Sequence, residues 1–376
     1  MEAVAERSGR RSGPTPYAKW KETEGIPVYT GSAVDDMHTC EVAPWARFGQ
    51  RGAFISLGDQ ARGDGYVVEI APGGQTTVQH HLAEVSLYVL QGSGATTFWQ
   101  HGSDRKQTVE WRAGSVFAAP LNCYYQHFNL DGQEPARLFG LTNLPEVLNQ
   151  FRSADFPFNA PYAFTDRYNG EDNYFTDSGE HLGWRRWRTN FIPDIRTFKL
   201  DEYQERGAGG TNMHFTLAES SQTGHVSDFP SATYKMGHRH GHGPHLIIVN
   251  GSGYSLFWYP GQERRKVPWR DGAILVPQAR EFHQHFNTGP TNARYLVFYM
   301  SRGGGTEVGG MSAGDGETNE RWLAPSTISI REGGDQIDYE DEDPSIYDEF
   351  AEECRRNGAE VRLPRPNYRA DRVVLT

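Results

Sequence analysis

The sequence predicts an all-β chain built from two tandem jelly-roll barrels, and two observations support this fold class. The chain is rich in glycine (42 residues), proline (21 residues) and aromatic residues (12%), and long helical periodicities are scarce. Short strands separated by glycine turns are typical of sandwiches and barrels. The second observation is an internal repeat, in which one order of strands and turns occurs twice.

The expected strands of the first copy are apolar, β-branched or aromatic runs bounded by turn residues. They cover residues 65–70, 85–90, 95–99, 109–111, 114–120, 124–129 and 136–143. The second copy repeats this pattern at 246–258, 269–277, 285–287 and 293–298, with order and spacing preserved. We therefore expect an N-terminal barrel at 44–144 and a C-terminal barrel at 213–302.

The segments outside the barrels carry other signals. Residues 1–15 predict a disordered tail, and residues 16–27 can hold a short helix. The stretch 145–212 is too aromatic for a free linker, so we expect a connector that packs on the barrels and adds edge strands. In the polar tail 303–376, Asp343-Pro344 and Gly358 are the start and stop signals of a helix at 343–357.

Composition and charge exclude several classes of function. The net charge of −11 argues against nucleic acid as a partner, because phosphate binding needs a basic surface. No apolar run approaches the ~20 residues that span a bilayer, and the N-terminal residues lack the apolar core of a signal peptide. We therefore expect a cytoplasmic protein with no membrane partner. Three widely separated cysteines favour neither a disulfide framework nor a cysteine zinc site.

Six of the 14 histidines lie in two short segments of the second copy. The pairs His238 with His240 and His283 with His285 are each two residues apart. On a strand, residues with this spacing face one side. Neutral imidazole is the commonest protein ligand for a transition metal. The pattern predicts a metal inside the second barrel, and an exposed histidine-rich loop is the alternative.

With the duplication in view, each half resembles a cupin, and the whole chain resembles a bicupin. The first cupin motif, His-x-His followed by a glutamate and a glycine turn, is matched by residues 238–251, with His245 in place of the glutamate. The second motif is matched by Gly272 to Pro277, which lacks one spacer residue, and by His283 to Asn287. The resemblance covers residues 53–144 and 213–300.

The histidine pattern is also similar to that of the gentisate and 1-hydroxy-2-naphthoate dioxygenases. In that branch three histidines and no glutamate hold Fe(II). The chain further resembles bicupins labelled ethanolamine ammonia-lyase-activating proteins. The family resemblance implies a homo-oligomer, a dimer or larger, with a divalent metal ion. Fe(II) is the expected ion, and Mn, Ni or Zn are the alternatives.

His238, His240 and His283 are the expected metal ligands, because they match the motif positions. His245 is either a fourth ligand or a polar residue of the cavity wall. If the strand bulges, His283 and its neighbour His285 would exchange roles.

Two further residues are candidates for catalysis. His285 shares a strand face with His283 and matches His127 of the first copy, which indicates a role in the fold or beside the ligands. Arg280 lies next to the second motif and could bind a substrate carboxylate with two hydrogen bonds. An ordinary surface arginine is the alternative.

The first copy holds a weaker set of candidate ligands. His81, Glu84 and His127 could make a reduced metal site, but Gln79 and Tyr125 replace two of the expected histidines. The loss of two ligands favours a structural or degenerate barrel, and a second metal is the alternative.

The leading functional hypothesis is a non-haem Fe(II) dioxygenase or other oxygenase that acts on a small aromatic or enolisable acid. Three nitrogen ligands leave positions for a bidentate substrate and O2. A metal-dependent isomerase, decarboxylase, lyase or hydrolase that uses no O2 is the first alternative, because one fold hosts many reactions. A non-enzymatic ligand-binding bicupin is the second.

Overall fold

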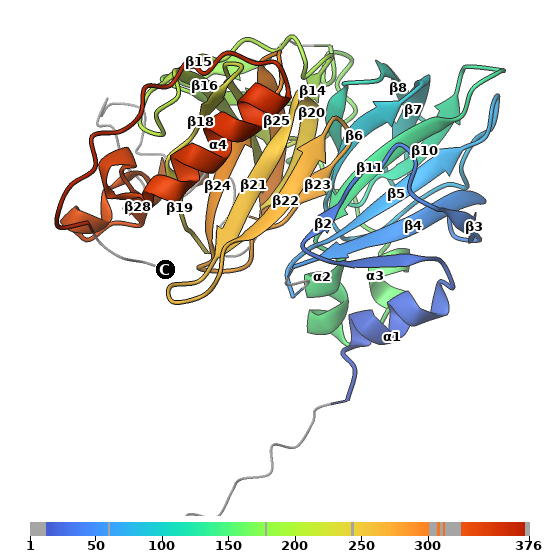
Figure 1. The fold of residues 1–376 in the computed structure, drawn as a ribbon. Coiled ribbons are helices and arrows are strands. Elements are labelled where there is room, and N and C mark those ends of the chain that lie inside the picture. Colours follow the sequence, from blue (N-terminus) through green and yellow to red (C-terminus); the bar gives the residue numbers. More distant parts are fainter. Residues whose placement is uncertain are drawn as a thin grey trace, which may run out of the picture.

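Two β-barrels lie side by side in the computed structural model, and apolar residues of both form a shared core at their contact (Figure 1). The structure describes residues 13–58, 61–176, 179–241, 244–300, 307–308, 311–312 and 325–372. Most of the predicted N-terminal tail lies outside the described residues. The predicted fold class, two tandem jelly-roll barrels with a connector and a short C-terminal helix, is confirmed.

The first barrel consists of two sheets whose inward side chains form one core. One sheet has the order β1-β4-β5-β11-β6-β9-β14, and the other has the order β10-β7-β8. Its main strands are β4 (Gln50–Leu57), β5 (Asp64–Ile70), β6 (Val85–Gln91), β7 (Ser93–Trp99), β8 (Gln107–Arg112), β9 (Val116–Ala119), β10 (Tyr124–Asn129) and β11 (Ala136–Thr142). Each run expected from the sequence of the first copy lies on one of these strands.

The second barrel repeats this arrangement. One sheet has the order β12-β13-β16-β17-β25-β20-β23-β2, and the other has the order β22-β21-β24-β19-β28. Its main strands are β16 (Gly210–Leu217), β17 (Gln222–Phe229), β18 (Thr233–Tyr234), β19 (Gly237–His238), β20 (His245–Asn250), β21 (Ser252–Trp258), β22 (Arg265–Arg270), β23 (Ile274–Leu275), β24 (Phe282–Asn287) and β25 (Ala293–Met300).

The duplication extends to individual hydrogen bonds. Asn129 and Asn287 end equivalent strands, and the side-chain amide of each donates to three backbone carbonyls at the adjoining turns. Gly94 and Gly253 lie where a Cβ atom would approach a carbonyl oxygen of the paired strand to 2.1 Å and 1.9 Å. Only glycine fits such a close approach of two backbones, which explains why both copies carry it.

The two barrels exchange short strands, so neither is built from one continuous stretch of chain. β2 (Ala33–Val34) precedes the first barrel in sequence but pairs with β23 of the second barrel. In the opposite direction, β14 (Phe191–Ile192) belongs to the connector but pairs with β9 of the first barrel. The connector also adds β12 (Glu180–His181), β13 (Arg186–Thr189) and β15 (Asp201–Tyr203) to the second barrel. The connector therefore packs on both barrels and adds edge strands, as expected.

The helices cover outer surfaces of the barrels (Figure 1). α1 (Pro16–Thr23), α2 (Leu144–Phe151) and α3 (Asp155–Asn159) cluster at the first barrel. α4 (Pro344–Arg356) begins after its cap Asp343, whose side chain accepts from the Ser345 amide, and packs Phe350 into an apolar cluster of the second barrel. Within the described part of the chain, no helix is long and apolar enough to cross a membrane.

Four further strands are short. They are β1 (Val28–Gly31), β3 (Ala43–Trp45), β26 (Glu307–Val308) and β27 (Met311–Ser312). A fifth, β28 (Gln336–Ile337), comes from the C-terminal segment and pairs with β19, the strand that carries His238. The C-terminal segment therefore completes the second barrel beside its cluster of histidines.

Candidate metal centre

Three histidines converge at one end of the sheet that contains β19 and β24. His238 on β19 lies directly opposite His283 on β24, and their ring centroids are 4.2 Å apart. The ring of His240, in the loop that follows β19, is 4.6 Å from that of His283 and 5.6 Å from that of His238. One nitrogen from each residue lies within 4.8 Å of the others, so the three can hold one metal ion. No carboxylate among the described residues belongs to this group.

Hydrogen bonds select the nitrogen that each of these histidines offers. The Nδ1 atoms of His238, His240 and His283 lie 3.4, 3.2 and 3.2 Å from the carbonyl oxygens of Met236, Gly241 and Glu281. A carbonyl oxygen only accepts, so each Nδ1 carries the proton and each Nε2 keeps a free lone pair. The backbone thus orients three Nε2 atoms as ligands, a common way of fixing metal-binding imidazoles.

Burial keeps these imidazoles neutral, which is the form that binds a metal. It lowers the pKa of His240 to about 4 and holds the pKa values of His238 and His283 well below the usual range for histidine. His238 and His283 are buried, whereas His240 is partly exposed at the rim. The three ligand positions predicted from the sequence are therefore the three histidines that the structure brings together.

His245 does not join this group, and the prediction of a fourth ligand does not fit the structure. Along β20, Leu246 and Ile248 belong to the core of the second barrel, whereas Ile247 and Val249 belong to the core between the barrels. Side chains alternate along a strand, so His245 shares the outward face of Ile247. Its pairing partner Phe298 also packs in the inter-barrel core. The glutamate position of the motif is thus not occupied by a ligand from β20.

His285 lies beside the ligands, but its Nδ1 atom accepts a hydrogen bond, whereas the Nδ1 atoms of the three ligands each donate one. Its ring centroid is 5.5 Å from that of His283, and its Nδ1 is 2.7 Å from the Ser255 hydroxyl, which accepts a hydrogen bond from the Trp269 indole at 3.0 Å. Because Ser255 is fully buried, its own proton is best satisfied by His285 Nδ1. Nε2 then carries the proton, so His285 is a hydrogen-bond donor rather than a ligand.

The first barrel contains the same hydrogen-bonded group of a histidine, a hydroxyl and a tryptophan at equivalent positions. His127 Nδ1 is 2.7 Å from the Thr96 hydroxyl, which accepts from the Trp111 indole at 2.9 Å. Burial lowers the pKa of His127 to about 3, as it does for His285. This arrangement survives in a barrel that lacks the three-histidine cluster, so it belongs to the fold of both barrels.

Replacing Ser255 by alanine should separate the structural role of this hydrogen-bonded group, which both barrels share, from a role in catalysis that only the second barrel has. The variant leaves the His285 and Trp269 nitrogens unpaired, so the free energy of unfolding should fall by about 1–3 kcal/mol, and turnover should fall because the His285 ring is no longer held. Thr96→Ala makes the matched change in the first barrel and should lose similar stability with unchanged turnover. Chemical denaturation and steady-state kinetics of both variants measure the two effects. Equal loss of turnover in both variants would contradict a role specific to the second barrel.

The counterpart of the metal centre in the first barrel is closed by a tyrosine. Tyr125 takes the place of His283, and its hydroxyl lies 2.9 Å from the Nε2 atom of His81. Gln79, at the position of His238, donates its side-chain amide to the Arg47 carbonyl at 2.9 Å. The nitrogen that would bind a metal is occupied by a hydrogen bond, which favours the structural interpretation of this barrel.

Glu84 and His127, the other predicted ligands of this first site, do not meet His81 in a metal group. Among the described residues only His238, His240 and His283 form such a group. Glu84 turns toward the second barrel instead. Its carboxylate pairs with Arg167 at 2.9 Å and accepts from the Ser221 amide at 3.0 Å and from the Ser221 hydroxyl.

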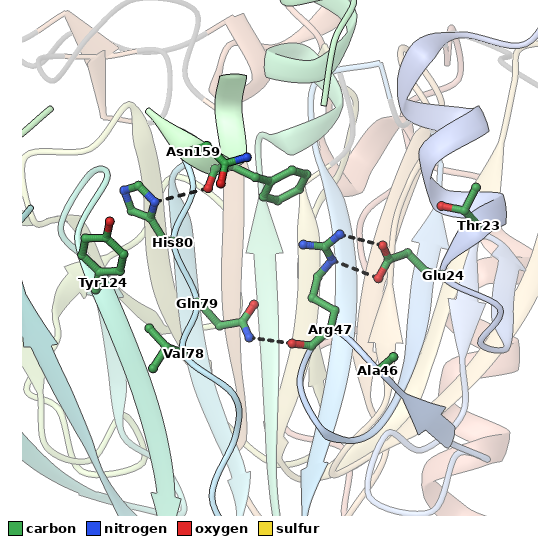
Figure 2. Close-up of a pocket in the computed structure, with 10 residues that line it drawn as sticks. Thr23, Glu24, Ala46, Arg47, Val78, Gln79, His80, Tyr124 and Asn159 are labelled. Carbon is green, nitrogen blue, oxygen red and sulfur yellow. Dashed lines mark hydrogen bonds and ion pairs between the residues drawn. The ribbon is translucent and has the colours of Figure 1, made fainter. Parts of the chain in front are cut away.

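A groove of about 560 Å³ lies at the mouth of the first barrel (Figure 2). Its polar groups are largely paired with one another. Arg47 forms two hydrogen bonds with the Glu24 carboxylate, at 2.9 and 2.8 Å, and His80 stacks on Tyr124 with ring centroids 4.0 Å apart. The groove therefore presents an aromatic wall and a neutralised arginine rather than a set of metal ligands.

Arg280 is bound by the C-terminal segment, a pairing that the sequence did not predict. Its guanidinium forms two hydrogen bonds with Asp335, at 2.6 and 2.8 Å, and Arg239 binds the same carboxylate at 2.7 Å. The amide of Arg280 also donates to the His240 carbonyl at 2.8 Å. Arg280 is thus committed to fixing the rim of the metal centre, and the prediction that it binds a substrate carboxylate does not fit this pairing.

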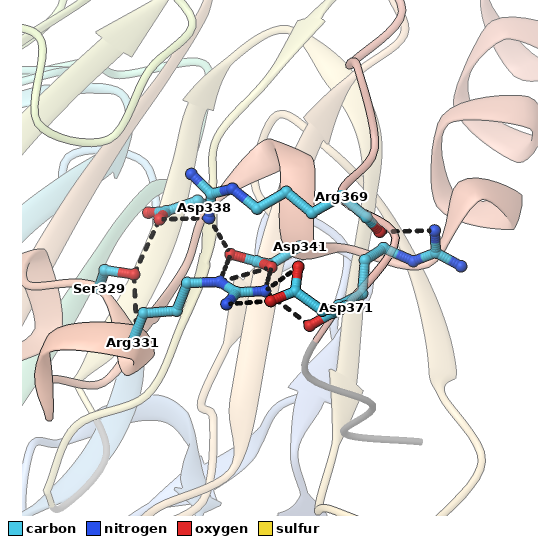
Figure 3. Close-up of polar contacts among 7 residues, drawn as sticks. Ser329, Arg331, Asp338, Asp341, Arg369 and Asp371 are labelled. Atoms are coloured by element: carbon cyan, nitrogen blue, oxygen red, sulfur yellow. Dashed lines mark hydrogen bonds and ion pairs between the residues drawn. The ribbon is translucent and has the colours of Figure 1, made fainter.

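A second ionic network anchors the same C-terminal segment (Figure 3). Asp341 is buried and pairs with Arg331 at 2.6 Å and with Arg369. Arg331 also pairs with Asp371 at 3.3 Å, and Ser329 donates to Asp338 at 2.8 Å. Together the two networks hold β28 against the ligand strand β19.

Behind the ligand strand, Glu342 is a buried carboxylate with neutral partners. Gln284, between His283 and His285 in sequence, donates to it at 3.1 Å, and the Tyr234 hydroxyl also donates to it. Burial raises the pKa of Glu342 to about 7. An unfolded glutamate ionises near ~4.3, so the folded chain holds a proton that the unfolded chain has lost.

The stability of the protein should therefore depend on pH through Glu342. This contribution is fully present below ~pH 4.3 and is lost as the pH rises through about 7, a change of about 3 kcal/mol. Glu342→Gln stays neutral at every pH, so we expect it to match wild type in unfolding free energy at pH 4 and to exceed it by about 3 kcal/mol at pH 8. Denaturant titrations from pH 4 to 8 measure this difference, with the exposed Glu360→Gln as control. A constant difference across the range would rule out this assignment.

Comparison with known proteins identifies a cupin domain in the first half of the chain. Residues 58–157 match the family model described as Cupin. This stretch contains most of the first barrel, and the second barrel repeats its strand order. No curated protein sequence matches this chain as a relative.

Solved structures with a similar arrangement include two oxalate decarboxylases. The Bacillus subtilis enzyme, described with Mn(II) centres, has 11% identity and a TM-score of 0.49 over 72% of this chain and 78% of that chain. The Lactobacillus farciminis enzyme, solved as a formate complex, has 11% identity and a TM-score of 0.49 over 73% of this chain and 87% of that chain. The resemblance of this chain to the gentisate branch stays a prediction.

Several residues of the candidate site were not found from the sequence. Ser255 and Trp269 could have been found by aligning the two copies, because Thr96 and Trp111 occupy the equivalent positions. Asp335 lies far from the histidine motifs in the chain, and no local pattern connects it with them.

Proposed function

We propose that the second barrel is the active site of a metal-dependent enzyme whose substrate is a small acid. The observation that supports this most directly is the convergence of three histidines, one nitrogen of each within 4.8 Å of the others, whose Nδ1 atoms are all bound to backbone carbonyls. This donor set suits a divalent transition metal, because neutral imidazole is a ligand for iron, zinc, copper and nickel. Such an ion would act as a Lewis acid and, in the case of Fe(II), would also supply electrons to O2.

The three ligands carry no charge, so a divalent ion would keep its full positive charge at the site. A substrate with two oxygen donors, one of them anionic, is the partner that this charge favours. The histidines would hold one side of the ion and leave the opposite side for the substrate. Phe257, whose ring centroid lies 6.4 Å from that of His283, adds an apolar surface next to the ligands.

His285 would act on the substrate rather than on the metal. Its Nε2–H donor, fixed by Ser255, can form a hydrogen bond with a substrate oxygen that gains negative charge during reaction. The pKa of His285, lowered by burial to about 3, keeps the ring neutral at physiological pH. A neutral donor of this kind orients and stabilises an anion without competing for the metal.

Fe(II)-dependent dioxygenation of an aromatic or enolisable acid is the first candidate reaction, because three protein ligands leave positions for a chelating acid and O2 together. A non-oxidative reaction such as decarboxylation is the second. The fixed donor of His285 favours it, because anion stabilisation by a hydrogen bond needs no oxidant.

Metal reconstitution with oxygen measurements tests the proposal and separates its two branches. The protein is loaded with Fe(II), Mn(II) or Zn(II) and assayed with phenolic and 2-oxo acids, with and without O2. O2 uptake matched to product supports the oxygenase, and product formed anaerobically supports the non-oxidative branch. A protein that retains none of these metals and converts no acid is a ligand-binding bicupin, and the proposal then fails.

A further inference from the structure

Lys235 is a buried lysine in the wall of the second barrel. Its exposed fraction is 1%. The ammonium group donates to the Tyr295 hydroxyl at 2.9 Å and lies over the rings of Phe229 and Tyr295, at 5.1 and 4.8 Å from their centroids. Phe229 and Tyr295 belong to the core of this barrel, so the ammonium group lies on the inner face of the wall.

No carboxylate of the described residues pairs with this ammonium group, in contrast to three arginines of the second barrel. Arg280 and Arg239 share Asp335, and Arg294 pairs with Asp228. A buried charge without a counter-ion is costly, and cation–π contacts with two rings offset only part of that cost. A buried ammonium group that has no counter-ion is a candidate for binding a ligand of opposite charge.

The position of Lys235 relative to the metal centre fits this role. Its backbone amide donates to the His285 carbonyl at 3.1 Å. Ring centroids lie 5.5 Å apart between His283 and His285 and 5.6 Å apart between His285 and Tyr295. His285 therefore lies next to both the ligand His283 and Tyr295, whose hydroxyl binds Lys235. His225, whose ring is 6.1 Å from that of Tyr295, has a buried Nδ1 with no hydrogen-bond partner among the described residues.

We propose that Lys235 and Tyr295 form an anion-binding subsite that holds a carboxylate of the substrate at the end remote from the metal. The ammonium group supplies the charge, and the Tyr295 hydroxyl supplies a second donor once the carboxylate takes the place of its present contact with Lys235. The substrate class is then an acid with a chelating oxygen pair at one end and a carboxylate at the other. This inference rests on the proposed function for the chelating end, whereas the carboxylate end rests on Lys235 alone.

The test compares carboxylates with their amides. Isothermal titration of the full-length protein, both zinc-loaded and metal-free, measures the Kd of benzoate and acetate against that of benzamide and acetamide. Wild type should prefer each carboxylate. Lys235→Met should raise the carboxylate Kd by about 10- to 100-fold, the loss expected for one charge-assisted hydrogen bond, and Tyr295→Phe should raise it by a few-fold. The matched control is Lys106→Met, because Lys106 also lies over an aromatic ring, 4.5 Å from the centroid of Trp99, but is exposed.

Thermal unfolding separates this subsite from a structural role. Removing an unpaired buried charge should leave the Tm of Lys235→Met at or above that of wild type. A variant that loses carboxylate binding and keeps its Tm supports the subsite. Equal Kd values for carboxylate and amide in wild type, or an unchanged Kd in Lys235→Met, would overturn it. If Lys235→Met does not fold, an unchanged carboxylate Kd in Tyr295→Phe overturns it as well.

The two proposals fail in different ways. If the metal-dependent function is wrong, wild type retains no metal, yet the metal-free chain still prefers benzoate through Lys235. If the subsite is wrong, metal binding by the three histidines is unchanged, and the carboxylate preference is absent in both states.

Discussion

Replacing His283 by alanine is expected to abolish tight metal binding and all turnover. His283 faces His238 across the β19–β24 pair and is the central member of the cluster, with both other rings within 4.6 Å. Without His283, only His238 on β19 and His240 in the following loop remain as ligands. Loss of an outer residue that only orients a ligand weakens metal binding by about 10- to 100-fold, so loss of the ligand itself should exceed about 100-fold. Metal analysis after dialysis, with kinetics on the same sample, measures both effects.

The controls for this prediction come from the duplication. His81→Ala changes the counterpart of His240 in the first barrel, and His245→Ala changes a histidine of the second barrel that faces away from the centre. Both variants should keep the metal stoichiometry of wild type. Loss of metal from His81→Ala would place a metal in the first barrel, and loss from His245→Ala would restore the four-ligand hypothesis.

Replacing Glu84 by alanine is expected to destabilise the protein by about 3 kcal/mol without changing its metal content. The Glu84 side chain is 8% exposed and that of its partner Arg167 is 22% exposed. The carboxylate also accepts hydrogen bonds from Ser221 of the second barrel. Removing one partner of a buried ion pair costs about 3–5 kcal/mol because the other charge is left unpaired, and partial exposure of Arg167 places the expected value at the lower end.

Thermal and denaturant unfolding of Glu84→Ala measure this loss, and Glu146→Ala at an exposed position of α2 is the control. If the barrels depend on this contact, the transition should also broaden, because the two barrels no longer unfold together. A variant with wild-type stability but reduced metal content would show that Glu84 is a ligand after all.

The sequence was sufficient to predict the two barrels because their strands repeat with the same turns. It also led to His238, His240 and His283 through the spacing of the histidine motifs, although His240 lies in the loop after β19 and not on the same strand as His238. These features depend on local periodicity, which a single sequence displays directly. The aromatic content of the connector indicated that it packs on the barrels, and the start and stop signals Asp343-Pro344 and Gly358 predicted the helix α4.

Features that depend on register or on distant pairing could not be predicted in this way. His245 was assigned to the site because it occupies the glutamate position of the cupin motif, but it lies on β20 on the face opposite to the barrel core. Arg280 looked free until Asp335, from a distant part of the chain, was seen to bind it. Lys235 has no sequence signature either, because its significance lies in the absence of a carboxylate from its surroundings.

The central claim is that the second barrel, and not the first, holds a metal. Anomalous diffraction from crystals of the metal-loaded protein, collected on both sides of the absorption edge of the loaded ion, tests it most directly. We expect one peak per chain, within coordination distance of the Nε2 atoms of His238, His240 and His283. A peak at His81 and His127, or no peak in crystals grown with Fe(II), Mn(II) or Zn(II), would contradict the account.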